Sequence, residues 1–314
     1  MEDRVLLGNE ELKKRLSMSF RSGKQSHCYL ICGPEGSGKR TLAAYMSQAL
    51  QCEGQPVPCG QCDGCRKVKG GVHPDVIVVD DSEKKSVQVA QIRQVQEDAF
   101  IRPNEGKKKI YLIPRAHLLT EQAQNALLKL IEEPPHYAVF LLLTANAEKL
   151  LPTVRSRSVE LRMEPVPFEA AAVWLQANAG GADLQTLRAA HLRCGGFLGQ
   201  TLQYLTGEDA FPLMADFVRA YADNDRYGIT AVFAFMEKLP RDKLLKSLTA
   251  LKRLMTEALA VRAGTVGSAD AMALARRRTA PELADAAKAL QTAMDRCAAN
   301  IGAGHICGLL AATL

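Results

Sequence analysis

The chain has 314 residues, of which 47% are hydrophobic and 24% are charged, and its formal net charge is +6. This balance is typical of a globular protein and excludes intrinsic disorder, collagen and a coiled-coil rod. At about 150 residues per domain the length predicts two or three domains, whose core needs no disulfide or metal staples. The charge alone is too small to identify a nucleic-acid-binding protein.

The cysteine content and the first residues indicate a reducing compartment. Met1–Arg4 lack the basic and apolar regions of a signal peptide, and no stretch approaches the roughly 20 apolar residues of a membrane span. Nine cysteines without a secretion signal are typical of the cytosol, where clustered cysteines more often hold a metal than form disulfides. We therefore expect a cytoplasmic protein that does not enter a membrane.

Short apolar runs alternate with amphipathic segments through the first half of the chain. Runs near turn signals predict buried parallel strands at residues 27–32, 76–79, 110–113 and 139–143. Segments between them predict helices at residues 41–50, 86–100 and 121–132. This alternation predicts a doubly wound α/β domain with right-handed crossovers.

The strand signals stop near residue 165, and the remainder predicts helices only. Pro165–Pro167 predicts a stiff linker, and a second break is expected near Thr206–Asp209. Apolar residues at three- and four-residue spacings predict helices at 242–261 and 281–300. We therefore expect three domains: an α/β domain over 1–165, a small helical domain over 166–207 and a second helical domain over 208–314.

A glycine-rich segment follows the first predicted strand. Gly33–Arg40 reads GPEGSGKR and matches most of a phosphate-binding P-loop. In such a loop, backbone N–H groups and the next helix N-terminus cradle a phosphate, and the lysine reaches the terminal phosphates. A glycine-rich turn without a ligand is the alternative. The candidate phosphate-binding residues are Gly33, Gly36, Gly38 and Lys39.

Groups that ATP hydrolysis requires are missing from this pattern. Arg40 replaces the hydroxyl residue that ligates Mg²⁺. Pro114 and Arg115 follow the third predicted strand, where metal-binding acids are needed. Asp80 and Asp81 end an earlier strand and are the alternative acids. The sequence predicts a site that does not hydrolyse ATP and leaves the binding of ATP or ADP open.

Four cysteines lie between the first predicted helix and the second predicted strand. Their Cys-x6-Cys-x2-Cys-x2-Cys spacing lets four sulfurs converge on a tetrahedral zinc ion, which would be structural because no coordination position stays open. The alternatives are metal-free cysteines and a redox pair, which is disfavoured because no helix N-terminus is expected beside it. The predicted zinc ligands are Cys52, Cys59, Cys62 and Cys65. The other cysteines are predicted to be buried fillers: Cys28, Cys32, Cys194, Cys297 and Cys307.

Two further segments complete a family pattern. Asn125–Pro135 reads NALLKLIEEPP, and Thr153–Ser158 reads TVRSRS. With the P-loop remnant and the four cysteines in this order, the chain closely resembles the delta-prime subunits of the bacterial DNA polymerase III clamp loader. The resemblance is strong over residues 1–165 and weaker beyond. It implies an AAA+ fold with a zinc module at 52–65, a small helical lid and a helical collar that assembles into a pentamer.

The resemblance also implies roles for single residues. Catalytic relatives keep a complete P-loop, an Asp-Glu pair and a lid arginine, whereas Gly196–Gly199 here contains no arginine. The family's arginine motif is kept as Ser156–Ser158, so Arg157 is expected to act in trans as an arginine finger on a neighbour's ATP. A salt bridge within its own fold is the alternative role for Arg157. Thr144 falls where the family places a nucleotide-sensing residue.

The resemblance implies a non-hydrolysing subunit that helps assemble the complex that loads the sliding clamp on primed DNA. Its expected partners are the tau/gamma and delta subunits, with the clamp and primer-template DNA reached through the complex. The complex as a whole belongs to a DNA-directed DNA polymerase, a nucleotidyltransferase. The main alternative is an active AAA+ ATPase, the catalytic tau/gamma-type subunit.

A third possibility makes the cysteine cluster a nucleic-acid-reading finger. It is disfavoured because the cluster has few basic and aromatic neighbours. The basic runs Lys107–Lys109 and Arg276–Arg278 are interpreted as solvated faces, with DNA contact as the alternative.

Overall fold

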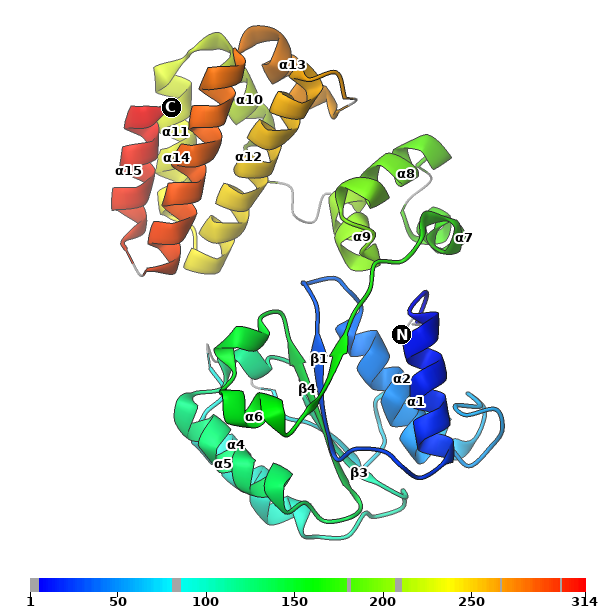
Figure 1. The fold of residues 1–314 in the computed structure, drawn as a ribbon. Helices are drawn as coiled ribbons and strands as arrows, with labels where there is room; N and C mark the ends of the chain where they lie inside the picture. Colours follow the sequence, from blue (N-terminus) through cyan, green and yellow to red (C-terminus); the bar gives the residue numbers. More distant parts are fainter. Residues whose placement is uncertain (1–5, 81–85, 180–181, 207–210, 266, 300) are drawn as a thin grey trace. The chain divides into compact units, whose positions relative to one another are not determined.

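The structure, a computed structural model, describes residues 6–80, 86–179, 182–206, 211–265, 267–299 and 301–314. The chain forms two compact units, Met1–Thr206 and Gly207–Leu314, each of which is described by itself (Figure 1). Most of the break expected near Thr206–Asp209 lies outside the described residues.

A five-stranded parallel sheet forms the centre of the first unit, with the strand order β2-β3-β4-β1-β5. The predicted α/β fold is confirmed, and all four predicted strands are present. The fifth strand was not predicted because it is a four-residue edge strand with three exposed side chains. The strands are β1 (Cys28–Cys32), β2 (Val76–Val78), β3 (Lys109–Ile113), β4 (Ala138–Thr144) and β5 (Val159–Arg162).

Alternating side chains of the central strands enter two separate cores. Leu30 and Phe140 belong to the core that also holds residues of α4, α5 and α6, while Ile31 and Leu141 belong to the core shared with α1 and α2. Figure 1 shows these two sets of helices on opposite faces of the sheet. Burial on both faces explains the continuous apolar runs, since each such side chain contributes about 1.5–3 kcal/mol. The helices are α1 (Glu10–Arg21), α2 (Lys39–Gln51), α4 (Val89–Ala99), α5 (Glu121–Glu132) and α6 (Pro152–Ser156).

Three helices follow the sheet within the first unit: α7 (Phe168–Asn178), α8 (Leu184–Arg193) and α9 (Leu198–Thr206). Their small core contains Val166 and Leu175. His191 is buried here, with Nε2 at 2.7 Å from the Val166 carbonyl oxygen and Nδ1 at 3.1 Å from Thr201 Oγ1. The histidine therefore joins the linker to α8 and α9.

The second unit is helical throughout its described residues. Its single core takes side chains from all of its helices, and the cysteines Cys297 and Cys307 are buried in it as predicted. No described helix is both long and apolar enough to cross a membrane. The helices are α10 (Met214–Asp223), α11 (Arg226–Glu237), α12 (Arg241–Arg262), α13 (Ala269–Arg277), α14 (Ala280–Ala298) and α15 (Ala303–Thr313).

Candidate functional site

The glycine-rich loop connects β1 to the N-terminus of α2, where a P-loop is expected. Gly36 and Gly38 have φ angles of 72° and 90°, a left-handed conformation that favours glycine. The Lys39 ammonium donates hydrogen bonds to the carbonyl oxygens of Gly33 and Pro34, both at 2.7 Å. Lys39 is therefore bonded to carbonyl groups of its own loop, whereas the sequence predicted that it reaches the terminal phosphates of a nucleotide.

The first turn of α9 lies directly on this loop. The Gly199 N–H donates to the Gly36 carbonyl oxygen at 2.9 Å, and the Gln200 side-chain amide donates to the Glu35 carbonyl oxygen at 2.8 Å. A Cβ on Gly36 would lie 2.6 Å from the Gln200 nitrogen, and one on Gly199 would lie 2.7 Å from the Gly36 Cα. This backbone contact therefore requires glycine on both sides and joins α9 to the loop.

Arg115 lies immediately beyond β3, where a hydrolysing enzyme needs acids. Its Nε and Nη2 atoms both donate to Asp80 Oδ1, at 2.9 and 2.7 Å. Arg40 Nη2 lies 3.8 Å from the other carboxylate oxygen of Asp80, which brings this acid within reach of the P-loop. Two guanidinium groups thus surround the carboxylate that was the alternative metal ligand, while Asp81 lies outside the described residues.

Thr144 ends β4 beside the same loop. Its side chain is fully buried, and its hydroxyl donates to the Asn146 carbonyl oxygen at 2.8 Å and accepts from the Asn146 N–H at 3.0 Å. The hydroxyl therefore caps a local turn, which is a structural role for a residue that the resemblance assigned to nucleotide sensing.

The four predicted zinc ligands come together. The sulfur atoms of Cys52, Cys59, Cys62 and Cys65 all lie within 4.8 Å of one another. In a tetrahedral site with Zn–S bonds of about 2.3 Å, the sulfurs would be about 3.8 Å apart, so the cluster is consistent with a zinc site. Backbone N–H groups also point at it: the Cys59 N–H lies 3.3 Å from Cys52 Sγ, and the Cys62 N–H lies 3.3 Å from Cys59 Sγ.

The expectation that no helix N-terminus lies beside the cysteines is wrong. Helix α3 (Asp63–Gly70) begins directly after Cys62, so this cysteine does lie at a helix N-terminus. Hydrogen bonding by the backbone at Glu53 lowers the pKa of the Cys62 thiol to about 6, whereas burial raises the pKa of Cys65. The preference for a metal site over a redox pair therefore rests on the convergence of four sulfurs, because a redox site needs only two cysteines.

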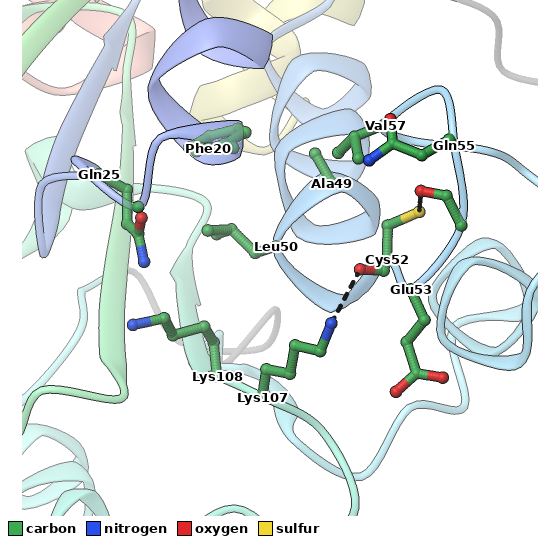
Figure 2. Close-up of a pocket in the computed structure, with 12 residues that line it drawn as sticks. Phe20, Gln25, Ala49, Leu50, Cys52, Glu53, Gln55, Val57, Lys107 and Lys108 are labelled. Atoms are coloured by element: carbon green, nitrogen blue, oxygen red, sulfur yellow. Dashed lines mark hydrogen bonds between the residues drawn. The ribbon is translucent and has the colours of Figure 1, made fainter.

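A cavity of about 490 Å³ adjoins the cysteine loop (Figure 2). Phe20 and Leu50 line it on one side, and Lys107 and Lys108 line it on another. Lys107 Nζ lies 3.5 Å from the carbonyl oxygen of Cys52, the first ligand, and donates to it. A hydrogen bond from Lys107 therefore connects the wall of the cavity to the cysteine cluster.

The two basic runs are only partly solvated faces, and the prediction is wrong for one residue in each. The side chain of Lys109 is 3% exposed and forms an ion pair with Asp98 at 2.8 Å. Arg278 donates to the Tyr221 carbonyl oxygen at 2.7 Å, and its guanidinium lies 4.5 Å from the centre of the Tyr221 ring. Both cations therefore stabilise the unit that contains them.

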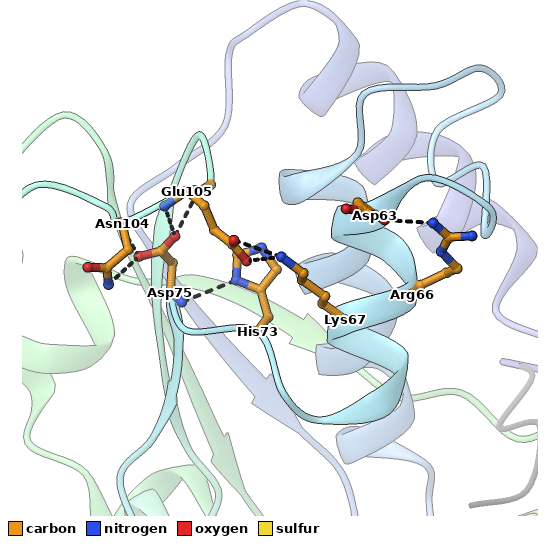
Figure 3. A network of polar contacts seen from close by, with 8 residues as sticks. Asp63, Arg66, Lys67, His73, Asp75, Asn104 and Glu105 are labelled. Carbon is orange, nitrogen blue, oxygen red and sulfur yellow. Dashed lines mark hydrogen bonds and ion pairs between the residues drawn. The ribbon is translucent and has the colours of Figure 1, made fainter.

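A polar network joins the cysteine module to the start of β2 (Figure 3). Lys67 on α3 donates to both carboxylate oxygens of Glu105 at 2.7 Å. The backbone of the same loop binds Asp75, which is fully buried: the N–H groups of Asn104, Glu105 and Gly106 donate to its carboxylate at 2.6–3.0 Å. Burial raises the pKa of Asp75, but these donors outweigh burial and hold it below its usual value.

We expect Asp75→Asn to lower the free energy of unfolding by about 1.5–3 kcal/mol at pH 7, because an amide offers one acceptor oxygen and turns an NH₂ group toward N–H donors. Since the folded pKa is depressed, the difference should be complete above pH ~4 and shrink as the pH falls through the folded value. Urea unfolding across this range measures it. The exposed carboxylate Asp63 is the matched control, and an equal loss in Asp63→Asn would contradict the assignment.

Arg157 lies at the C-terminal end of α6 and is 41% exposed. Its Nη2 atom forms an ion pair with Glu132 Oε1 at 2.9 Å, and its Nη1 atom donates to the Thr153 carbonyl oxygen at 3.3 Å. An ion pair within the chain was the alternative expected for Arg157, and the structure shows one. Its partner Glu132 was not identified from the sequence, although the acid lies in one of the two segments that carry the family resemblance. Exposed ion pairs of this kind contribute at most about 1 kcal/mol, so the guanidinium can still engage a charged partner.

Comparisons with known proteins agree on one group. Residues 8–167 match the family described as "DNA polymerase III, delta subunit". The chain is 33% identical over 160 residues to the DNA polymerase III subunit gamma of Buchnera aphidicola, covering 50% of this chain and 44% of that protein. It is 33% identical over 166 residues to subunit tau of Escherichia coli, covering 52% and 26%. The chain thus spans less than half the length of these curated relatives.

Among solved structures, the chain is similar to a DNA polymerase III gamma-subunit-related protein of Thermotoga maritima. The TM-score is 0.54 at 19% sequence identity, with 95% of this chain and 97% of that chain covered. At this identity the likeness shows a shared fold, including the helical region that follows the sheet.

Proposed function

This chain belongs to the DNA polymerase III delta subunit family of clamp-loader proteins, and we propose that it is the non-hydrolysing delta-prime subunit. In this role it assembles with tau/gamma and delta subunits into the complex that loads the sliding clamp on primed DNA. It contributes Arg157 to the ATP site of a neighbouring subunit. A catalytic tau/gamma-type subunit is the alternative, favoured by the names of the curated relatives.

The ion pair between Arg115 and Asp80 is the observation that favours a non-hydrolysing subunit over a catalytic one. A hydrolysing P-loop enzyme needs acids that hold Mg²⁺ and a hydroxyl on the loop. Here Arg115 follows β3, bonds the nearby carboxylate through two nitrogen atoms, and Arg40 approaches the same acid from the loop. A divalent cation would have to displace or repel two guanidinium groups to reach it, which disfavours hydrolysis.

The contact between α9 and the glycine-rich loop supports the same conclusion. Gly36 and Gly199 touch through their backbones, so a nucleotide bound to the loop would have to be accommodated beside this contact. Nucleotide binding would have to break the two bonds from Lys39 to loop carbonyls. Ser37 Oγ, buried and without a hydrogen-bond partner among the described residues, is a donor that a phosphate oxygen could use. We therefore propose weak phosphate binding at most, through Gly33, Gly36, Gly38 and Lys39.

We also propose roles for the remaining parts. Residues 1–165 form the AAA+ core, 166–207 the lid and 208–314 the collar used in assembly. The four clustered cysteines would hold one structural zinc ion, which would cross-link the end of α2 to the N-terminus of α3.

Assembly with purified tau/gamma and delta subunits tests the proposed role. We expect a pentamer containing one copy of this chain, measured as a single species by light scattering after size exclusion. The matched control is the same mixture without this chain, which should not form a species of that mass. A complex of equal mass in both mixtures would contradict the assignment.

A further inference from the structure

We propose that Glu132 is a positioning residue that holds Arg157 ready for its neighbour's nucleotide. The inference rests on the proposed finger role of Arg157. It concerns an ion pair between two residues that are 25 positions apart in the sequence: Glu132, the last residue of α5, and Arg157, which directly follows α6.

The geometry leaves the guanidinium partly free. Glu132 occupies one N–H of Nη2, at 2.9 Å, and the Thr153 carbonyl oxygen occupies one N–H of Nη1, at 3.3 Å. An arginine has five N–H donors in a fixed plane, so three remain for a phosphate. Because both anchors can stay in place while those donors are used, the carboxylate fixes the orientation of the fork and does not have to be displaced.

The neighbouring charged residues lack this arrangement. Arg155, two positions earlier, forms no ion pair with a described carboxylate, and Glu133, next to Glu132, forms no hydrogen bond or ion pair with the described residues. Glu132 and Arg157 are both partly exposed, at 46% and 41%. The pair therefore contributes little to the stability of the fold, and its effect should lie in the orientation of one side chain.

The expected effect follows from the strength of exposed ion pairs. Loss of the carboxylate should lower kcat about 2- to 5-fold at the ATP site that Arg157 completes. KM should not change, since a finger acts on charge that develops in the transition state. The amide introduced by Glu132→Gln still offers one acceptor oxygen to the guanidinium, so this variant should fall between the wild type and Glu132→Ala.

The experiment measures ATP turnover by the assembled complex, with clamp and primed DNA, for Glu132→Ala, Glu132→Gln and the control Glu133→Ala. Each is also combined with Arg157→Ala in a double-mutant cycle. We expect Glu133→Ala to match the wild type and Glu132→Ala to have no further effect once Arg157 is absent. An unchanged mass of each complex shows that assembly is intact.

The outcomes separate this proposal from the function on which it rests. If Arg157→Ala slows turnover but Glu132→Ala does not, only the positioning role is overturned. If Glu132→Ala accelerates turnover, the carboxylate restrains the finger, which also overturns it. An equal effect of Glu132→Ala with and without Arg157 would show a structural role. If Arg157→Ala itself changes nothing, the finger fails, and the positioning role fails with it.

Discussion

Replacement of Arg157 by alanine is expected to slow ATP hydrolysis at the adjacent subunit's site about 10³-fold. A guanidinium is permanently charged and planar, and it stabilises charge that develops on the transferring phosphoryl group. In its own chain the residue is only partly exposed and is held by one surface ion pair, with Glu132, so its loss should leave the fold intact.

The measurement is clamp- and DNA-stimulated turnover of the assembled complex, with the other ATP sites disabled through their P-loop lysines so that one site is observed. Arg155→Ala is the matched control, because it removes the same charge two residues away and should cost much less. An Arg157→Ala complex that hydrolyses ATP and loads clamps at the wild-type rate would show that the finger assignment is wrong.

Removal of one cysteine from the cluster is expected to abolish zinc binding. Structural zinc sites contribute about 10–16 kcal/mol of binding free energy at neutral pH, and one missing thiolate leaves the ion an open position. For Cys62→Ser we expect zinc to fall from one ion per chain to near none. Proteolysis between α2 and α3 should accelerate, while the sheet and its two cores, large enough alone, persist.

Elemental analysis of protein purified without chelators measures the zinc, and limited proteolysis measures the loosening. Cys32→Ser is the control, because this half-buried cysteine lies outside the cluster and should leave zinc binding intact. Wild-type protein without stoichiometric zinc would contradict the assignment.

The central strands and the convergence of the four cysteines could be predicted from the sequence, for a physical reason. β1 and β4 are buried on both faces, so their positions are apolar up to the terminal Thr144 of β4 and the pattern is continuous. The four cysteines lie within 14 consecutive residues, so their spacing alone keeps the four sulfur atoms close together. β5 was not predicted, because an edge strand with exposed side chains has no such apolar run. The alternation of Val159 and Leu161 with charged residues was its one signal.

Contacts between distant segments could not be predicted. The backbone contact of Gly36 with Gly199 depends on how α9 packs onto a loop more than 150 residues earlier, and the presence of a glycine alone does not predict it. The buried state of Lys109 depends on Asp98 from α4 in the same way. From the sequence alone, a run of charged residues is assigned to the surface. Only tertiary packing shows which residue of the run is buried.

We propose that this chain hydrolyses no ATP itself although it keeps most of a P-loop. Phosphate release by the purified chain, with ATP and Mg²⁺, tests it most directly when compared with Lys39→Ala measured in parallel. The Arg115–Asp80 pair and the substitution of Arg40 for a hydroxyl predict equal background release from both proteins. Mg²⁺-dependent turnover that disappears in Lys39→Ala would contradict the claim and identify a catalytic subunit.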